Sequence, residues 1–253
     1  MIIDRSFIVA LVYRERGFIM KQNMQNNGKR LQHKKTAGLL LVLLCLTLTV
    51  NTGCNLSKSG MQSLPDAPKT SRSDKDTVNR PWYLTLVNRW NPLPEDYDLE
   101  LAELDGGEQV DRRIYEPLTK MLEAAEAEGL GPIVVSGYRT RAVQQRFMDE
   151  KIDEFRQEGY SKSEAEELAK EWVAIPGTSE HELGLAVDIN GDTYDIYPWL
   201  QKNSYKYGFI FRCPADKKDI TGIAEEVWHY RYVGAKAAKE IYERGLCLEE
   251  YLQ

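Results

Sequence analysis

The chain has 253 residues and a net charge of −6, which is long enough for one sizeable domain or two small ones. The charge is unevenly spread, because residues 1–80 hold 13 Lys and Arg against 5 Asp and Glu, whereas residues 81–253 hold 20 against 34. An acidic folded part argues against nucleic-acid binding, which needs a basic surface.

The first residues have the pattern of an export segment. A basic stretch at residues 21–35 precedes the apolar run Ala37–Val50. This run is shorter than the roughly twenty residues of a membrane span, and the combination is typical of an export signal. The run is followed by Cys54 in a sequence that resembles a bacterial lipoprotein cleavage site. We expect residues 1–54 to be an export signal that anchors the chain to the membrane, as a retained signal anchor or through a lipidated Cys54.

Residues 55–80 have the composition of a linker. They are rich in Ser, Lys, Asp, Pro, Thr and Asn and hold too few apolar side chains to bury a core. We expect a flexible tether and therefore place the folded domain at residues 81–253, outside the cytoplasmic membrane.

The predicted elements of the domain are short and mixed. Strands are predicted at residues 82–87, 132–136 (buried), 185–189, 209–212 and 228–232, and helices at residues 110–128, 141–157, 161–172, 198–205 and 235–244. Pro117 predicts a kink or a fresh start in the first helix, and Ser161 with Glu164 forms a capping box that opens the third. Helices come early and strands gather later, which favours an α+β fold over repeating βαβ units.

Two of the three histidines of the chain lie beside carboxylates near predicted strands. His181 precedes Asp188 by seven residues, and Asp188 lies in an apolar run where a carboxylate is costly unless it is paired or bound to a cation. His229 follows about forty residues later. Two His and one carboxylate are the usual protein ligands of a catalytic zinc. The sequence predicts a zinc site at these three residues, although the ligand types also admit manganese or iron.

Glu226 and Arg139 are candidates for the chemistry around such a metal. Glu226 lies three residues before His229 and is the predicted base that takes a proton from water. Glu225 is the competing candidate, and alternation along an extended segment lets only one of the two face the metal. Arg139 lies at a strand-to-helix junction, and we predict that it stabilises a developing oxyanion.

The predicted domain holds two cysteines, Cys213 and Cys247, and neither has the spacing of a structural zinc site. In an exported protein two such cysteines form either a disulfide or a pair of buried free thiols. The sequence leaves both possibilities open.

Together these motifs resemble the VanY-type D-alanyl-D-alanine carboxypeptidases, which are zinc peptidases that share a fold with the hedgehog signalling domain. The resemblance covers about residues 82–253. The matching pieces are SGYRT at 136–140, PGTSEH at 176–181, GLAVDI at 184–189, YGFI at 207–210, DITGI at 219–223 and EVWHYRYVG at 226–234.

The resemblance implies a fold, a cofactor and roles for single residues. It implies an α+β domain with a small central antiparallel sheet and helices packed on it. It also implies a base, a residue that binds the substrate carbonyl or carboxylate, and two residues around the terminal D-alanine. The residues implied to bind zinc are His181, Asp188 and His229. The implied base is Glu226, and Arg139 is the residue for the substrate carbonyl or carboxylate. Gln144 and Ser179 are the two residues around the terminal D-alanine.

We therefore expect a monomeric zinc carboxypeptidase of the cell envelope that removes the terminal D-alanine from peptidoglycan stem peptides. Three alternatives stay open: an L,D-carboxypeptidase, an endopeptidase that cuts inside the stem, and a non-catalytic hedgehog-like module that binds zinc. The presence of both Glu226 and Arg139 argues against the last, because a binding module needs no base.

Overall fold

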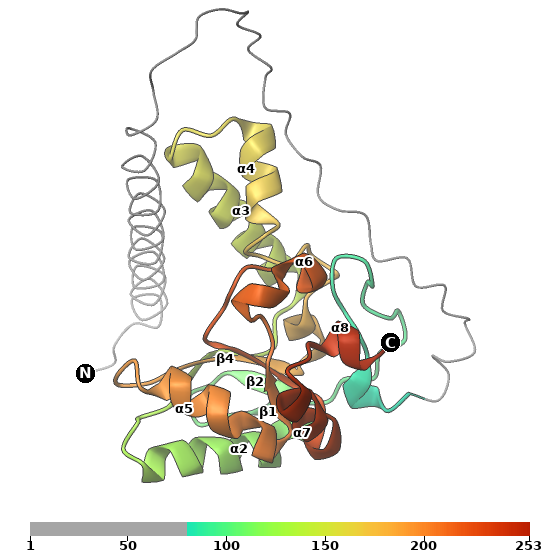
Figure 1. The fold of residues 1–253 in the computed structure, drawn as a ribbon. Coiled ribbons are helices and arrows are strands. Elements are labelled where there is room, and N and C mark those ends of the chain that lie inside the picture. Colours follow the sequence, from blue (N-terminus) through green and yellow to red (C-terminus); the bar gives the residue numbers. More distant parts are fainter. Residues whose placement is uncertain (1–79) are drawn as a thin grey trace, which may run out of the picture. The chain divides into compact units, whose positions relative to one another are not determined.

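Four short antiparallel strands form the central sheet, in the order β3-β4-β6-β5, and a separate hairpin pairs β1 with β2 (Figure 1). The computed structural model describes residues 80–253. The predictions about the export signal, Cys54 and the linker up to residue 79 lie outside these residues. Within the described part, no helix has the length and apolar character needed to cross a membrane.

The elements are short, and most of the helices follow the first hairpin. The strands are β1 (Leu101–Glu103), β2 (Gln109–Asp111), β3 (Ile133–Ser136), β4 (Ala186–Asn190), β5 (Phe209–Phe211) and β6 (His229–Tyr232). The α-helices are α2 (Arg112–Ala127), α3 (Arg141–Gln157), α4 (Lys162–Ala169), α5 (Ile196–Asn203), α6 (Lys218–Thr221), α7 (Ala235–Arg244) and α8 (Leu248–Tyr251). Four 3-10 turns are η2 (Trp82–Leu84), η3 (Glu180–Leu183), η4 (Ser204–Tyr207) and η5 (Ala215–Lys217).

The two faces of the central sheet differ in chemistry, because side chains alternate along each strand. Asp188 of β4 pairs directly with His229 of β6, and directly paired residues project from the same face. Their sequence neighbours Val187, Ile189 and Tyr230 project from the opposite face and are fully buried. One face of the sheet is therefore polar, and the other belongs to the apolar core.

The core is built from amphipathic helices. Helix α2 turns Ile114, Leu118, Met121 and Ala125 inward, and their spacing of three and four residues places them on one helical face. Burying a side chain such as Leu118 contributes about 1.5–3 kcal/mol to stability. In Figure 1, α2 and α5 lie on one side of β4, and the α3–α4 pair extends on the other.

Several predicted boundaries are confirmed. Helix α3 spans Arg141–Gln157 and α7 spans Ala235–Arg244, as the periodicity predicts. The predicted capping box opens α4, since Ser161 Oγ accepts from the Glu164 amide and the Glu164 carboxylate accepts from the Ser161 amide. The α+β class with a small antiparallel sheet is confirmed as well.

The prediction of a strand at residues 82–87 is wrong. Trp82–Leu84 forms the 3-10 turn η2, in which Thr85 Oγ1 donates to the carbonyl of Trp82 at 2.8 Å. The aromatic side chains here pack on Tyr232 of β6, with ring centroids of Trp82 and Tyr232 6.0 Å apart. The strand-like composition therefore reflects packing on the sheet and not membership in it.

Three other expectations change at the start of the domain. Val110 lies in β2, so the helix begins only at Arg112, and α2 continues through Pro117 as one helix. The sequence gives no sign of the β1–β2 hairpin, whose strands are three residues each. β3 is not fully buried, because it lies at the edge of the sheet and leaves Ile133 50% exposed.

Both domain cysteines are free thiols. Cys213 and Cys247 are buried at 4% and 1% exposure and form no disulfide. Burial, with the charge of Glu226 nearby, raises the pKa of the Cys213 thiol well above its ordinary value. The structure therefore answers the question that the sequence left open, in favour of two buried thiols.

Candidate metal centre and active site

Three elements bring the predicted metal ligands together. The β4–β6 register places Asp188 directly opposite His229, and the short turn η3 carries His181. Ser179 caps η3 by accepting a hydrogen bond from the amide of His181. Gly184 ends η3 with a φ of 68°, and a Cβ there would lie 2.8 Å from the amide nitrogen of Asp111. Only glycine allows this close turn into β4.

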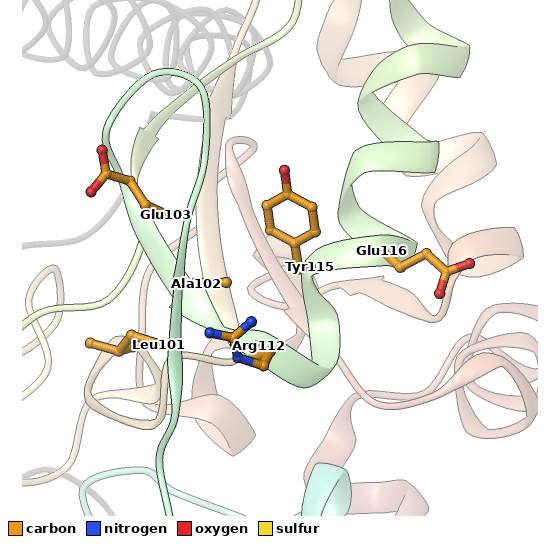
Figure 2. A pocket seen from close by; sticks show the side chains of 6 residues that line it. All are labelled: Leu101, Ala102, Glu103, Arg112, Tyr115 and Glu116. Atoms are coloured by element: carbon orange, nitrogen blue, oxygen red, sulfur yellow. The ribbon is translucent and has the colours of Figure 1, made fainter.

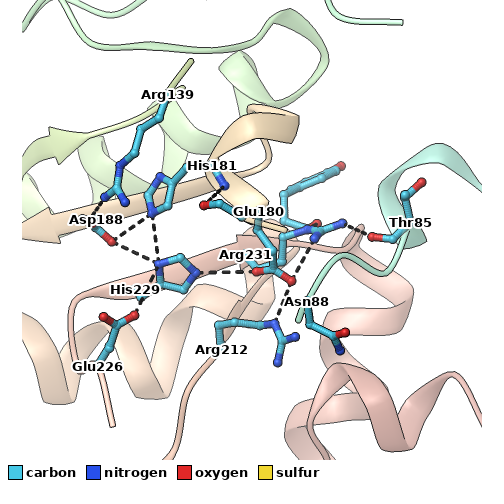
Figure 3. A network of polar contacts seen from close by, with 12 residues as sticks. Thr85, Asn88, Arg139, Glu180, His181, Asp188, Arg212, Glu226, His229 and Arg231 are labelled. Carbon is cyan, nitrogen blue, oxygen red and sulfur yellow. Dashed lines mark hydrogen bonds and ion pairs between the residues drawn. The ribbon is translucent and has the colours of Figure 1, made fainter. Parts of the chain in front are cut away.

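The three side chains present their ligand atoms within a few tenths of an ångström of the spacing in a tetrahedral zinc site. His229 Nδ1 lies 3.1 Å from Asp188 Oδ1 and 3.2 Å from His181 Nε2 (Figure 3). Asp188 Oδ1 and His181 Nε2 are 3.4 Å apart. A tetrahedral zinc with bonds of about 2.0–2.2 Å holds its ligand atoms about 3.3–3.6 Å apart. All three residues are buried. The donor set and its spacing therefore fit a zinc ion.

Neighbouring groups fix the orientation of two of these ligands. His181 Nδ1 donates to the carbonyl of Gly137 at 2.7 Å, which leaves Nε2 for the metal. Arg139 Nη2 donates to Asp188 Oδ2 at 2.6 Å, which leaves Oδ1 for the metal. A Cβ on Gly137 would lie 2.2 Å from the carbonyl oxygen of Gln109. A larger residue at position 137 would therefore push the two backbone segments apart and displace the Gly137 carbonyl that His181 contacts.

In the absence of metal, the two histidines differ in charge. Burial alone would lower the pKa of His229, but the neighbouring carboxylates of Asp188 and Glu180 raise it to about 9. Burial and then the charge of Arg139 lower the pKa of His181 to about 4. At neutral pH the metal-free pair therefore holds one proton more than two neutral imidazoles, because His229 is positively charged and His181 is neutral.

We expect zinc binding to displace this proton, because zinc binds the neutral imidazole. The apparent zinc affinity should rise about tenfold per pH unit up to about pH 9. Calorimetry at pH 6 in two buffers of different protonation enthalpy should show one proton released; a value near zero would contradict a protonated His229. The raised pKa also stabilises the metal-free fold at low pH, and this contribution should be lost as pH rises through about 9.

Of the two candidate bases, Glu226 is the one that faces the metal ligands. Its Oε2 lies 3.9 Å from His229 Nδ1, and its side chain is 16% exposed. Glu225 is exposed to solvent. The two residues lie in irregular chain before β6 and not in an extended strand, and the His229 amide donates to the Glu226 carbonyl at 3.0 Å. The choice of Glu226 as the base stays a prediction.

The other predicted residues surround the same cluster. The guanidinium of Arg139 is held by Ser136 Oγ at 2.8 Å, and its Nη1 lies 3.4 Å from Gln144 Oε1. Gln144 is 1% exposed and donates from Nε2 to the carbonyl of Ala174. Ser179 is buried as the cap of η3. In the structure both Gln144 and Ser179 have internal partners, so they support the neighbouring residues Arg139 and His181.

The structure adds residues that the sequence analysis does not single out. Glu180 lies behind His229 and pairs with Arg212 and Arg231, and Arg212 pairs in turn with Glu249. Their positions in the sequence carry no signal, because buried and exposed charges look alike in a sequence. The only hint is that Glu180 adjoins a predicted metal ligand.

A separate pocket lies away from this chemistry. Figure 2 shows that it lies between the β1 hairpin and the first turns of α2. Its lining residues are Leu101, Ala102, Glu103, Arg112, Tyr115 and Glu116. None of them is a predicted site residue, and the metal centre is therefore the candidate active site.

A buried His, Asp and His cluster with a neighbouring glutamate, on an α+β scaffold, defines a metal-dependent hydrolase that uses one ion. A family model described as VanY, D-alanyl-D-alanine carboxypeptidase, matches residues 107–235, which hold every predicted site residue. The chain belongs to this family.

Individual relatives agree with this assignment. A D-alanyl-D-alanine carboxypeptidase of Enterococcus faecalis is 50% identical over 201 residues, which cover 78% of this chain and 75% of the relative. A zinc complex of a mutant of the vancomycin-resistance D,D-pentapeptidase VanY from a VanB-type cassette is 54% identical, with a TM-score of 0.67 over 68% of this chain and 100% of that chain. VanYB in complex with D-alanine-D-alanine is 55% identical, with a TM-score of 0.67 over 68% and 98%.

Proposed function

We propose that this chain is a zinc-dependent D-alanyl-D-alanine carboxypeptidase that hydrolyses the last peptide bond of peptidoglycan stem peptides. The observation that carries the proposal is the buried cluster of His181, Asp188 and His229, with ligand atoms 3.1–3.4 Å apart. The zinc and D-alanine-D-alanine complexes of its VanY relatives support the metal and the substrate class.

Glu226 is the proposed general base. When bound, zinc supplies Lewis-acid activation of water and of the scissile carbonyl. Glu226 takes the proton of the attacking water and passes it to the leaving amine of D-alanine. Its carboxylate lies 3.9 Å from His229 Nδ1, which supports this role because a base must lie within reach of a group at the metal.

Arg139 is the proposed partner of the substrate oxygen. Contacts with Asp188 and Ser136 hold its guanidinium beside the metal cluster, so little of its orientation must be fixed when substrate binds. From that position it stabilises the negative charge that develops on the carbonyl oxygen or binds the terminal carboxylate. Gln144 and Ser179 complete the proposal as residues around the terminal D-alanine, which is supported by their contacts with Arg139 and His181.

The Arg139→Met variant should lose about 10²- to 10³-fold in kcat, because a preorganised positive charge is removed from the site of the oxyanion. The measurement is steady-state release of D-alanine, with zinc content determined in the same samples. Arg146→Met is the matched control, since Arg146 also lies over the ring of Phe147 but is 60% exposed and contacts Glu150. Equal activity of the two variants would remove Arg139 from the mechanism.

A digestion assay tests the function itself. The purified full-length chain with zinc should remove one alanine from the stem pentapeptide, as read by mass spectrometry, and a chelator should block the reaction. Cleavage of the tetrapeptide instead would indicate an L,D-carboxypeptidase, and cleavage only within cross-linked wall would indicate an endopeptidase. No cleavage by a zinc-loaded chain would favour the non-catalytic zinc module.

The proposal also places the enzyme outside the cytoplasmic membrane, as a monomer anchored through its N-terminal segment. The basic stretch and the apolar run at residues 37–50 support this location, as does a substrate that belongs to the cell wall. Cell fractionation tests it: the full chain should be recovered with membranes. A Cys54→Ser variant separates the two anchors, because it should be released only if Cys54 carries the lipid.

A further inference from the structure

Four buried charges that sum to zero lie behind the metal ligand His229, and Figure 3 shows three of them, Glu180, Arg212 and Arg231, on the side of the ring away from Asp188. The four residues are Glu180, Arg212, Arg231 and Glu249, which we call the charge cluster. Each is at most 7% exposed. Burying four charges is costly unless each is paired, so their presence beside the metal calls for an explanation.

Glu180 is the member that faces the metal ligand. Its Oε1 is paired twice, with Arg212 Nε at 2.8 Å and with Arg231 Nη1 at 3.0 Å. Its Oε2 is buried, has no hydrogen-bond partner among the described residues, and lies 3.5 Å from His229 Nε2. The two arginines therefore fix one oxygen of the carboxylate and leave the other for the imidazole.

The two histidine ligands use opposite ring nitrogens. His181 directs Nε2 toward the other two metal ligands and donates from Nδ1 to a backbone carbonyl. His229 directs Nδ1 toward the other two metal ligands. The proton of its neutral form must therefore lie on Nε2, which points at Glu180. A carboxylate at this position favours that tautomer, because it attracts the N–H dipole and polarises the ring toward the metal.

The residues that hold Glu180 in place come from distant parts of the sequence. Arg212 binds Glu249 through both terminal nitrogens, at 2.9 and 2.6 Å. Glu249 lies in α8, and Asn88 near the start of the domain donates to it at 2.9 Å. Two ends of the described chain therefore fix the group that faces His229.

We propose that Glu180 is a positioning residue for the zinc ion: it holds His229 in the tautomer that binds metal through Nδ1, and Arg212 and Glu249 hold Glu180. The inference rests on the proposed function only in that the ion is zinc. It assigns Glu180 no contact with substrate and no proton transfer.

Metal affinity is the direct test, measured on the full-length chain by competition with a chromophoric chelator. Glu180→Gln should bind zinc about 10- to 100-fold more weakly than the unmodified chain. It should also shift the visible absorption bands of the cobalt-substituted protein, because the ligand field at His229 changes. A loss of packing alone would not move those bands in the folded protein.

Glu182→Gln is the matched control. Glu182 lies in the same turn η3 and is 5% exposed, but its carboxylate accepts from the amide of Gly177 at 2.7 Å and does not face the metal ligands. This variant should keep the zinc affinity and the cobalt spectrum of the unmodified chain. Glu180→Gln with a zinc affinity within twofold of that value and an unchanged spectrum would overturn the proposal.

A second measurement needs no variant and therefore does not depend on folding of Glu180→Gln. In zinc-loaded protein with 15N-labelled histidine, His229 should show a metal-bound Nδ1 and a protonated Nε2, and His181 the reverse. Zinc bound to Nε2 of His229 would overturn the proposal. A chain that binds no zinc at all would instead contradict the proposed function.

Discussion

Glu226→Gln should bind zinc with the affinity of the unmodified chain and lose about 10²- to 10⁴-fold in kcat. The amide keeps the size of the side chain but cannot accept the proton of water. Because Glu226 is 3.9 Å from His229 Nδ1 and does not belong to the cluster of three ligands, its charge should matter more for catalysis than for metal binding. The measurements are D-alanine release and zinc content on the same preparation.

The neighbouring Glu225→Gln variant is the control for this experiment. Glu225 is exposed and directly precedes Glu226, so the same change in charge is made at the adjacent residue. It should retain full activity. Loss of activity in Glu225→Gln, with activity retained in Glu226→Gln, would move the base to Glu225.

Arg212→Met should destabilise the metal-free fold by about 3–5 kcal/mol. Arg212 is 4% exposed and binds both Glu180 and Glu249. Its removal leaves two buried carboxylates with Arg231 as the remaining buried cation among them, and an uncompensated buried charge is far more costly than a lost surface pair. Urea denaturation of the full-length chain in the presence of a chelator measures the change.

Arg112→Met makes the same substitution at an exposed ion pair. Arg112 Nε lies 2.7 Å from Glu100, but the two side chains are 59% and 72% exposed. Surface pairs of this kind add little to stability, so the denaturation midpoint should stay within experimental error. Equal midpoints for the two variants would mean that the charge cluster does not stabilise the fold.

The metal ligands could be predicted from sequence because their signal is local and chemically restrictive. Two histidines at short distances from carboxylates, beside apolar strands, leave few alternatives, and the structure brings His181, Asp188 and His229 within reach of one ion. Helices α3 and α7 were predictable for a similar reason, since long periodic stretches and a clear start such as that at Arg141 depend little on the rest of the fold.

The remaining features depend on tertiary partners that the sequence does not reveal. Trp82 has strand composition but packs on Tyr232 from outside the sheet. Arg231 lies two residues after His229 on the same face of β6 and looks like a surface residue of a strand, yet it is fully buried because Glu180 approaches from a different element. Such pairings become visible only when segments far apart in sequence are placed side by side.

The two free thiols make this domain independent of the redox state of its surroundings. A thiol reacts through its thiolate, and burial raises the pKa of Cys247 to about 12, so both cysteines stay protonated and shielded at neutral pH. No covalent cross-link joins residues between 80 and 253. This part of the chain can therefore reach its native state without an oxidising catalyst, and it should tolerate both a reducing cytosol during production and exposure to peroxide.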